Sequence, residues 1–155
     1  MNKNNDSVSI SLKEQKELLI KDLCARLPYG VKIELTWWVM DEGTCMSTTL
    51  EPDHIEQIRN DELGDVEIKS YLRPMSSMTD EEFTNLKEYS GLKYDQLDLN
   101  SFENGTYKCL DFYLREVPSY VVIKVFDWLN KYHFDYRNLI TMDLAIDATG
   151  LNIYD

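Results

Sequence analysis

The sequence predicts an α+β domain: an antiparallel or mixed sheet of four or five strands packed against two main helices, with short helices besides. Three observations point to this class. Apolar residues occupy every second position over residues 31–39, which is the pattern of a strand with one buried face. Capping boxes of the S/T-x-x-E type open helices after Ser11 and Thr79. An Asn104-Gly105 pair between two strand-like runs predicts a hairpin.

The length and composition bound the number of domains. The chain has 155 residues, of which 43% are hydrophobic. A chain of this size buries about 70% of the surface that it exposes when unfolded, which is enough for one core. The apolar content excludes a wholly disordered acidic chain. We therefore expect a flexible tail over residues 1–10 and a single α+β domain over residues 11–155.

The first half of the domain is predicted to hold one helix and three strands. The helix begins after Ser11 and ends before Gly30, with an apolar stripe at Leu12, Leu19, Leu23 and Leu27. The strand over 31–40 turns at 41–43 and pairs with a return strand over 44–50. A loop or short helix over 52–60 then precedes a third strand over 66–72, which ends before Pro74.

The second half is predicted to hold two longer helices and the hairpin. One helix runs from Thr79 to about Tyr89, and the hairpin strands cover 99–103 and 106–114. The most apolar segment, 118–132, is β-branched enough for a strand. We interpret it as a mostly buried helix, because Lys124, Asp127 and Lys131 fall on one helical stripe. A short helix over 136–142 is the last element that the sequence predicts.

The charge is uneven along the chain. There are 28 acidic and 16 basic residues, and residues 41–103 alone carry 16 acidic against 5 basic side chains, out of a formal net charge of −12. This balance argues against direct binding of nucleic-acid phosphates, which needs a basic face. The acidic middle is either a solvated surface or a face that binds a basic protein, in its sharpest form by imitating nucleic acid.

Trp38 is the candidate anchor for such a partner. On the alternation described above, it points to the polar face of its strand, away from Trp37. A tryptophan on an exposed face is typical of an interface, whereas a helix that covered this face would make it a core residue. We group it with the acidic run that follows as a candidate partner-binding set: Trp38, Asp61, Glu62, Asp65 and Glu67.

Motifs for targeting, metals and catalysis are missing from the sequence. The polar start lacks the pattern of a secretory signal, and the densest apolar run is too short for a membrane helix, so we expect a cytoplasmic protein. The three cysteines lie apart and form no C-x-x-C pair. His54 among carboxylates is predicted to be a surface residue, and Cys109 a buried thiol rather than a nucleophile paired with His133. We expect no metal and no cofactor.

Three stretches carry a resemblance, and the first is Leu27-Pro28-Tyr29-Gly30 followed by the alternating strand. The other two are Leu72-Arg73-Pro74-Met75-Ser76-Ser77-Met78-Thr79 and the region of residues 127–146 that contains Asp127-Trp128-Leu129-Asn130 and His133-Phe134-Asp135-Tyr136-Arg137-Asn138-Leu139-Ile140. They resemble small uncharacterised phage- and prophage-associated proteins of gut bacteria. The resemblance implies an origin in mobile elements and no mechanism. Members of that group often have glycine where Asn138 stands here.

The same stretches contain a candidate pocket, at Arg73, His133, Asp135 and Arg137. The two arginines are suited to bind a carboxylate or phosphate, provided that the fold brings them together. These residues are equally suited to close an ordinary core, with His133 bonded to a carbonyl or to Asp135 at a corner.

The expected function is therefore a non-catalytic, acidic protein-interaction domain, encoded by a phage or mobile element and acting on another protein, for example as an inhibitor of a host protein. The alternative is a small enzyme or ligand-binding domain that uses Arg73, His133 and Arg137. Convergence of these three side chains in one cleft would favour the alternative. The sequence leaves the oligomeric state open, because an exposed Trp38 could equally bind a second copy.

Overall fold

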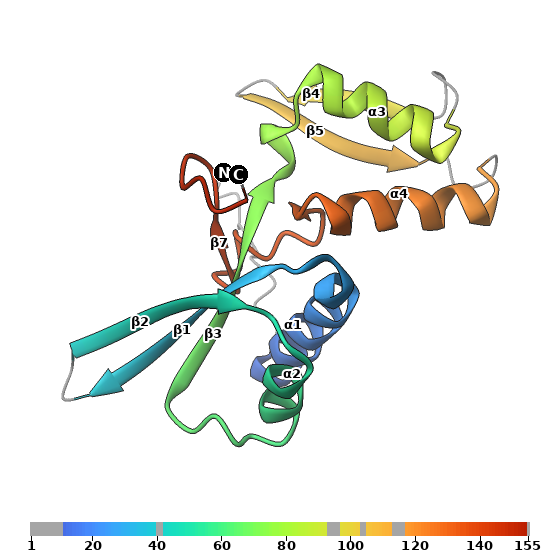
Figure 1. Cartoon of the computed structure of the whole chain (residues 1–155). Coiled ribbons are helices and arrows are strands. Elements are labelled where there is room, and N and C mark those ends of the chain that lie inside the picture. The colour runs from blue at the N-terminus through green and yellow to red at the C-terminus, as the bar shows by residue number, and fades with distance from the viewer. Residues whose placement is uncertain (1–10, 40–41, 93–96, 103–104, 113–116, 155) are drawn as a thin grey trace, which may run out of the picture.

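The structure is a computed structural model that describes residues 11–39, 42–92, 97–102, 105–112 and 117–154, with the side chains of Val39 and of residues 97–112 left out. The expected tail over 1–10 lies outside this range. The described chain forms α-helices, two 3₁₀ turns and strands (Figure 1). In order these are α1 (Leu12–Arg26), η1 (Leu27–Tyr29), β1 (Lys32–Val39), β2 (Glu42–Thr49), α2 (Pro52–Arg59), β3 (Val66–Pro74), η2 (Met75–Ser77), α3 (Asp80–Ser90), β4 (Leu97–Phe102), β5 (Gly105–Phe112), α4 (Ser119–Lys131), β6 (Phe134–Asp135) and β7 (Ala145–Asp147). The α+β class is confirmed.

The main sheet is mixed and centres on β3. Its strand order is β2-β1-β3-β6, with β7 also paired to β3. The first part of β3 runs antiparallel to β1, with Val66 opposite Trp37 and Ser70 opposite Ile33. Its later residues instead pair in parallel with β7 and then with β6. The predicted hairpin of β4 and β5 forms a separate two-stranded sheet.

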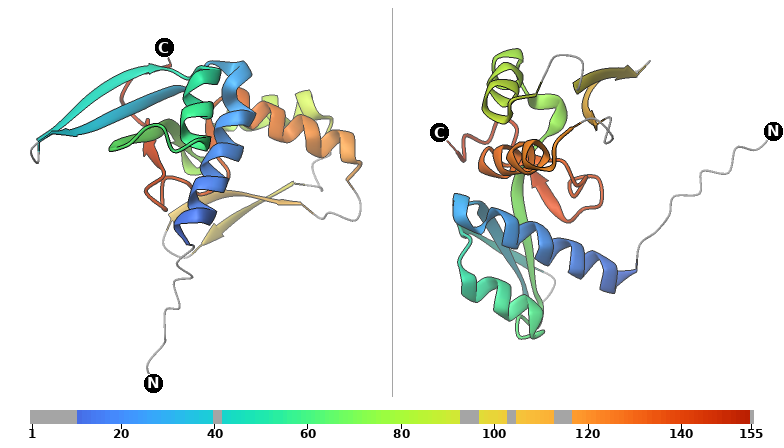
Figure 2. Two further views of the ribbon diagram at one scale, coloured as in Figure 1. Left: turned by 90° about the horizontal axis from the view of Figure 1, so that it is seen from below. Right: turned by 90° about the vertical axis from the view of Figure 1, so that its right-hand side faces the viewer.

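Two hydrophobic cores lie toward the two ends of this central strand. The first gathers α1 and α2 against β1 and β3, around side chains such as Leu23, Ile33 and Ile68. The second gathers α3 and α4 around Trp128 and Phe134. Figure 1 shows β3 running from the first group of elements to the second, and the right-hand view of Figure 2 shows the same separation. The predicted helix over 118–132 is confirmed as α4, but the expectation that it is mostly buried is wrong. One face, with Val121, Val125 and Trp128, lies in the second core, whereas Tyr120 and Ile123 on the other face are exposed.

Both predicted capping boxes are present. The Ser11 hydroxyl accepts from the backbone N–H of Glu14 at 3.3 Å, and the Glu14 carboxylate accepts from the Ser11 N–H at 2.8 Å. Thr79 and Glu82 form the same pair at the start of α3. The expected leucine stripe of α1 is wrong at its first member, because Leu12 is 83% exposed in the first turn. Propensity and capping place the helix, but they do not decide which turn meets the core.

The predicted short helix over 136–142 is wrong. That segment forms turns, and β6 and β7 flank it as two short strands that the sequence reading missed. The Asp135 carboxylate accepts from the backbone N–H groups of Leu139 and Ile140, at 2.9 and 2.8 Å. Asn138 and Asp143 both adopt a left-handed φ, near +63° and +59°. Such backbone ends a helix, and Asn and Asp tolerate it better than most residues do.

A fully buried ion pair joins α1 to β6. Asp22 and Arg26 are both 0% exposed, and Arg26 Nε donates to the Asp22 carboxylate at 2.7 Å. Arg26 Nη2 also donates to the carbonyl of Phe134 at 2.8 Å. The second Asp22 oxygen lies 3.2 Å from Arg137 Nε, close enough for an ion pair although not aligned as a hydrogen bond. Arg26 and Arg137 both lie over the Tyr136 ring.

This pair leads to a stability prediction. We expect Asp22→Leu and Arg26→Met each to lower the free energy of unfolding by about 3–5 kcal/mol, because each removes one partner of a buried ion pair. Arg137 stays 3.2 Å from Asp22 in Arg26→Met, so the loss for that variant should lie at the lower end of this range. The double variant removes both charges, so its loss should be clearly smaller than the sum of the two single losses. Urea denaturation of the four proteins checks this. Lys21→Met on the exposed side of the same helix is the control and should change little, whereas additive losses would contradict the prediction.

Candidate functional site

Trp38 is exposed, so no helix covers it. Its exposed fraction is 58%, whereas its neighbour Trp37 packs against the first core. The β1–β2 hairpin extends beyond α1 and α2, which lie on the other side of the sheet (Figures 1 and 2). Of the two interpretations that the sequence left open for Trp38, the structure therefore supports the exposed surface residue.

The Trp38 ring lies across the neighbouring strand β2. Trp38 is paired with Gly43, and a Cβ built on Gly43 would lie 3.4 Å from Trp38 Cζ3 and 3.6 Å from Cη2. These are atoms at the far end of the indole, so the ring reaches over the glycine toward the outer side of β2. The ring therefore covers part of Gly43. It also leaves a large apolar surface exposed beside β2, the end strand of the sheet.

The acidic members of the predicted partner-binding set are exposed but do not gather with Trp38 on one face. Glu67 lies opposite Thr36, on the same side of the sheet as Trp38, and Asp65 precedes it. Asp61 instead pairs with Lys16 of α1, and Glu62 lines a groove with Trp37 on the helix-bearing side. Glu67 is itself 3.3 Å from Lys69. The set is therefore divided between two sides of the sheet and partly neutralised by lysines.

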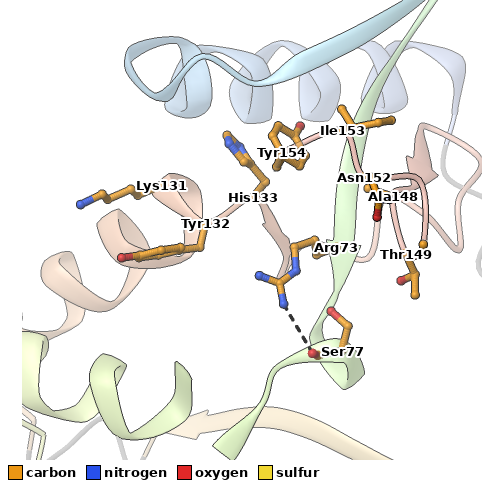
Figure 3. A pocket seen from close by; sticks show the side chains of 11 residues that line it. Arg73, Ser77, Lys131, Tyr132, His133, Ala148, Thr149, Asn152, Ile153 and Tyr154 are labelled. Carbon is orange, nitrogen blue, oxygen red and sulfur yellow. Dashed lines mark hydrogen bonds between the residues drawn. The ribbon is translucent and has the colours of Figure 1, made fainter. Parts of the chain in front are cut away.

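A cavity of about 640 Å³ lies where the end of β3, the corner between α4 and β6, and the C-terminal segment meet (Figure 3). Eleven described residues line it, and none of them is acidic. They are Arg73, Ser77, Lys131, Tyr132, His133, Ala148, Thr149, Gly150, Asn152, Ile153 and Tyr154.

Arg73 is held rigidly at the floor of this cavity. Its Nη1 and Nη2 donate to the two carboxylate oxygens of Glu82, at 2.7 and 3.1 Å. Its Nη2 also lies 3.5 Å from the Ser77 carbonyl, and the guanidinium lies over the Phe134 ring at 4.3 Å. Burial raises the pKa of Glu82, but the bonds from Arg73 and Thr79 outweigh it and the pKa of this carboxyl is lowered. Glu82 thus stays ionised and fixes the plane of the guanidinium.

His133 is the buried titratable group of the cavity. It is 7% exposed, stacks on Tyr154 with ring centroids 4.0 Å apart, and adopts a left-handed φ of 60°. Its Nδ1 is buried without a hydrogen-bond partner, in contrast to the expected bond to a carbonyl or to Asp135. Burial, together with the positive charges of Arg26 and Arg73, lowers the pKa of His133 to about 4. The imidazole is therefore neutral at pH 7.

The four predicted pocket residues do not all converge. Arg73 and His133 line the cavity, but Asp135 and Arg137 are not among its lining residues. Asp135 caps the following turn through its carboxylate, and Arg137 pairs with Asp22. The Ser77 hydroxyl donates to the Pro74 carbonyl at 2.8 Å rather than to the imidazole. Of the three side chains that the alternative function requires in one cleft, Arg73 and His133 line the cavity and Arg137 does not.

The sequence reading missed the contribution of the chain's end. Tyr154 accepts from the Lys32 backbone N–H at 3.1 Å and donates to the Tyr71 carbonyl at 2.6 Å, which ties the C-terminal segment to β1 and β3. Burial raises the pKa of this phenol to about 12. The signal for a turn before it was Ala148-Thr149-Gly150, in which Gly150 has a positive φ. Nothing in the sequence pairs Tyr154 with His133.

Other predicted residues have structural roles. His54 accepts from the Glu51 backbone N–H through Nδ1 at 3.0 Å and so helps to cap α2, while the Cys109 side chain lies outside the described residues. In the part of the chain that the structure covers, no group of three or more His, Cys, Asp or Glu side chains is placed to hold a metal. None of the described helices is long and apolar enough to span a bilayer.

No protein-family model, curated protein or solved structure matches this chain. The resemblance to phage-associated proteins therefore stays a prediction. Any assignment of function has to come from the geometry of the two features described above: the exposed edge at Trp38 and the cavity at Arg73 and His133.

The burial of His133 predicts a pH dependence of stability. The folded-state pKa of about 4 lies below the unfolded value of 6.5, so unfolding takes up a proton between these two values. The stabilisation is complete above pH 6.5 and falls as the pH is lowered toward 4, by on the order of 3 kcal/mol. We expect His133→Asn, which tolerates the left-handed backbone, to flatten this part of the profile.

Urea denaturation of both proteins at a series of pH values measures the effect. The difference in unfolding free energy between wild type and His133→Asn should shrink as the pH falls from 7 to 4. His54→Asn is the matched control for the other histidine and should leave the slope unchanged, since His54 lies on α2 and does not line this cavity. A wild-type slope that His133→Asn leaves intact would show that the imidazole does not cause it.

Proposed function

We propose that this protein is a non-catalytic protein-interaction domain that binds an extended segment of another protein along β2. The observation that carries the proposal is the end position of this eight-residue strand. In the sheet that the structure describes, β1 pairs with one side of β2 and no strand pairs with the other. An unpaired strand edge offers backbone donors and acceptors to an incoming strand.

The composition of β2 supports this role. Proteins protect exposed edges with Lys, Pro or a bulge, but Glu42-Gly43-Thr44-Cys45-Met46-Ser47-Thr48-Thr49 contains neither residue and pairs with β1 in an unbroken register. The first six residues of β2 are exposed, and Met46 is 48% exposed. Trp38, whose ring crosses Gly43, would contact the side chains of an added strand and supply the apolar anchor.

Partner charge is a second element of the proposal. Residues Glu51 to Lys69, which follow the hairpin in the chain, contain seven acidic and two basic side chains, and the last of them pair with β1. Such a field favours approach of a basic partner. The split of Asp61 and Glu62 from Trp38 favours strand addition with electrostatic steering over imitation of nucleic acid. If DNA displaced this protein from its partner, imitation of nucleic acid would again be the better explanation.

The test uses peptides selected from a random library on the full-length protein. We expect the selected peptides to protect backbone amides of β2 from hydrogen exchange. Trp38→Ala and Met46→Lys should each weaken peptide binding about tenfold or more, because one removes the anchor and the other puts a charge beside the added strand.

Two exposed positions on α4 supply matched controls. Tyr120→Ala removes an aromatic ring that is 62% exposed, and Ile123→Lys adds a charge at a side chain that is 67% exposed. Neither should change binding. Peptides that bind all four variants alike, or that protect amides elsewhere, would refute docking at β2. Sedimentation of the protein alone distinguishes a partner from pairing of β2 with a second copy.

A further inference from the structure

The cavity between β3, the α4–β6 corner and the C-terminal segment differs from the rest of the molecule in charge. The chain carries 28 acidic residues, yet the eleven described side chains around this cavity include Arg73, Lys131 and a buried histidine but no Asp or Glu. In an acidic protein, a cation-lined hollow is the place where a small anion meets least repulsion. We propose that this cavity binds a small anion that also carries a planar ring, the chemistry of a nucleoside monophosphate.

The cationic groups define where the anion lies. Arg73 is 26% exposed at its side chain and is held in place by Glu82, so binding costs it little conformational entropy. Lys131 at the end of α4 lies with Nζ 5.5 Å from the centre of the Tyr132 ring. In Figure 3 the Arg73 guanidinium lies below His133, whereas the Lys131 side chain extends to the left of the view, away from Arg73. A phosphate at Arg73 would share the guanidinium with Glu82, and the Lys131 side chain would have to turn toward it.

His133 adds a buried polar group that the protein leaves unpartnered. It is more than nine-tenths buried, lines the cavity, and keeps a left-handed backbone that costs a non-glycine residue about 1 kcal/mol. Strain and an unsatisfied polar atom in one residue are uncommon in a merely structural corner and cluster at binding sites. Because Nδ1 has almost no accessible surface, a ligand in the cavity meets the ring of His133 and not this nitrogen.

Aromatic surfaces define where the ring lies. Tyr132 is 39% exposed at the cavity, and the stacked pair of His133 and Tyr154 forms another part of its lining. Planar bases stack on such rings with little sequence preference among bases. The volume of about 640 Å³ falls within the usual range of small-molecule sites. Together these features fit an anion with a ring better than a bare ion.

Calorimetric titration of the full chain with AMP, adenosine and inorganic phosphate tests the proposal. We expect AMP to bind more tightly than either fragment. Lys131→Ala should weaken AMP binding about tenfold, because it removes a charge-assisted bond. Glu82→Gln should strengthen it by about threefold, because it frees Arg73 from a competing carboxylate while an amide oxygen still caps α3.

Lys124→Ala is the matched control, since Lys124 is exposed on the same helix two turns earlier and does not line the cavity. It should leave AMP binding unchanged. Adenosine binding as tightly as AMP would refute the role of the anion, and phosphate binding as tightly would refute the role of the ring. No heat from AMP, or an equal loss in Lys124→Ala, would overturn the proposal. Peptide binding at β2 is independent of each of these outcomes.

Discussion

The buried Arg26 guanidinium is the contact on which the arrangement of the two cores depends. Through Nε it bonds Asp22 on its own helix, and through Nη2 it bonds the Phe134 carbonyl on β6. Leu23 of the same helix belongs to the first core and Phe134 to the second. One side chain therefore holds α1 against β6, the short strand that follows α4. A hydrophobic contact of similar area would be less directional, because only hydrogen bonds specify which carbonyl is met.

The cavity exists because β3 changes partners along its length. Its first residues pair with β1. Its last residues pair with β7 and β6, which come from the C-terminal part of the chain. The switch brings Arg73 beside His133, whose carbonyl accepts from the Arg73 N–H at 2.8 Å. Tyr154 then closes the space from the C-terminal side through its bonds to Lys32 and Tyr71. The site is thus a consequence of topology, with residues from three distant parts of the chain.

This origin explains what sequence reasoning could and could not predict. Local signals were sufficient for the helices at Ser11 and Thr79, for the alternating strand with Trp38, and for the helix over 118–132, because caps and periodicity are encoded within a few residues. The sequence did not predict the burial of Asp22 and Arg26. A charged pair four residues apart on a helix is typical of a solvated face, and only the fold reveals that Arg26 also bonds the Phe134 carbonyl. The short strands β6 and β7 were missed because two or three residues carry no period. Arg73 and His133 were grouped correctly, whereas Asp135 and Arg137 are taken up by neighbours that only the fold reveals.

The net charge of −12 now has a more specific meaning than the composition suggested. Several of the cations are used internally, with Arg26 and Arg137 around Asp22 and Arg73 on Glu82, so the acidic excess is left on the outside. Both candidate binding regions are gaps in that excess: β2 has one acidic residue among eight, and the described lining of the cavity has none. Repulsion from the surrounding carboxylates disfavours anionic macromolecules at the surface. The two proposals therefore rest on how the charge is distributed rather than on its total, since both place a ligand where described acidic residues are few.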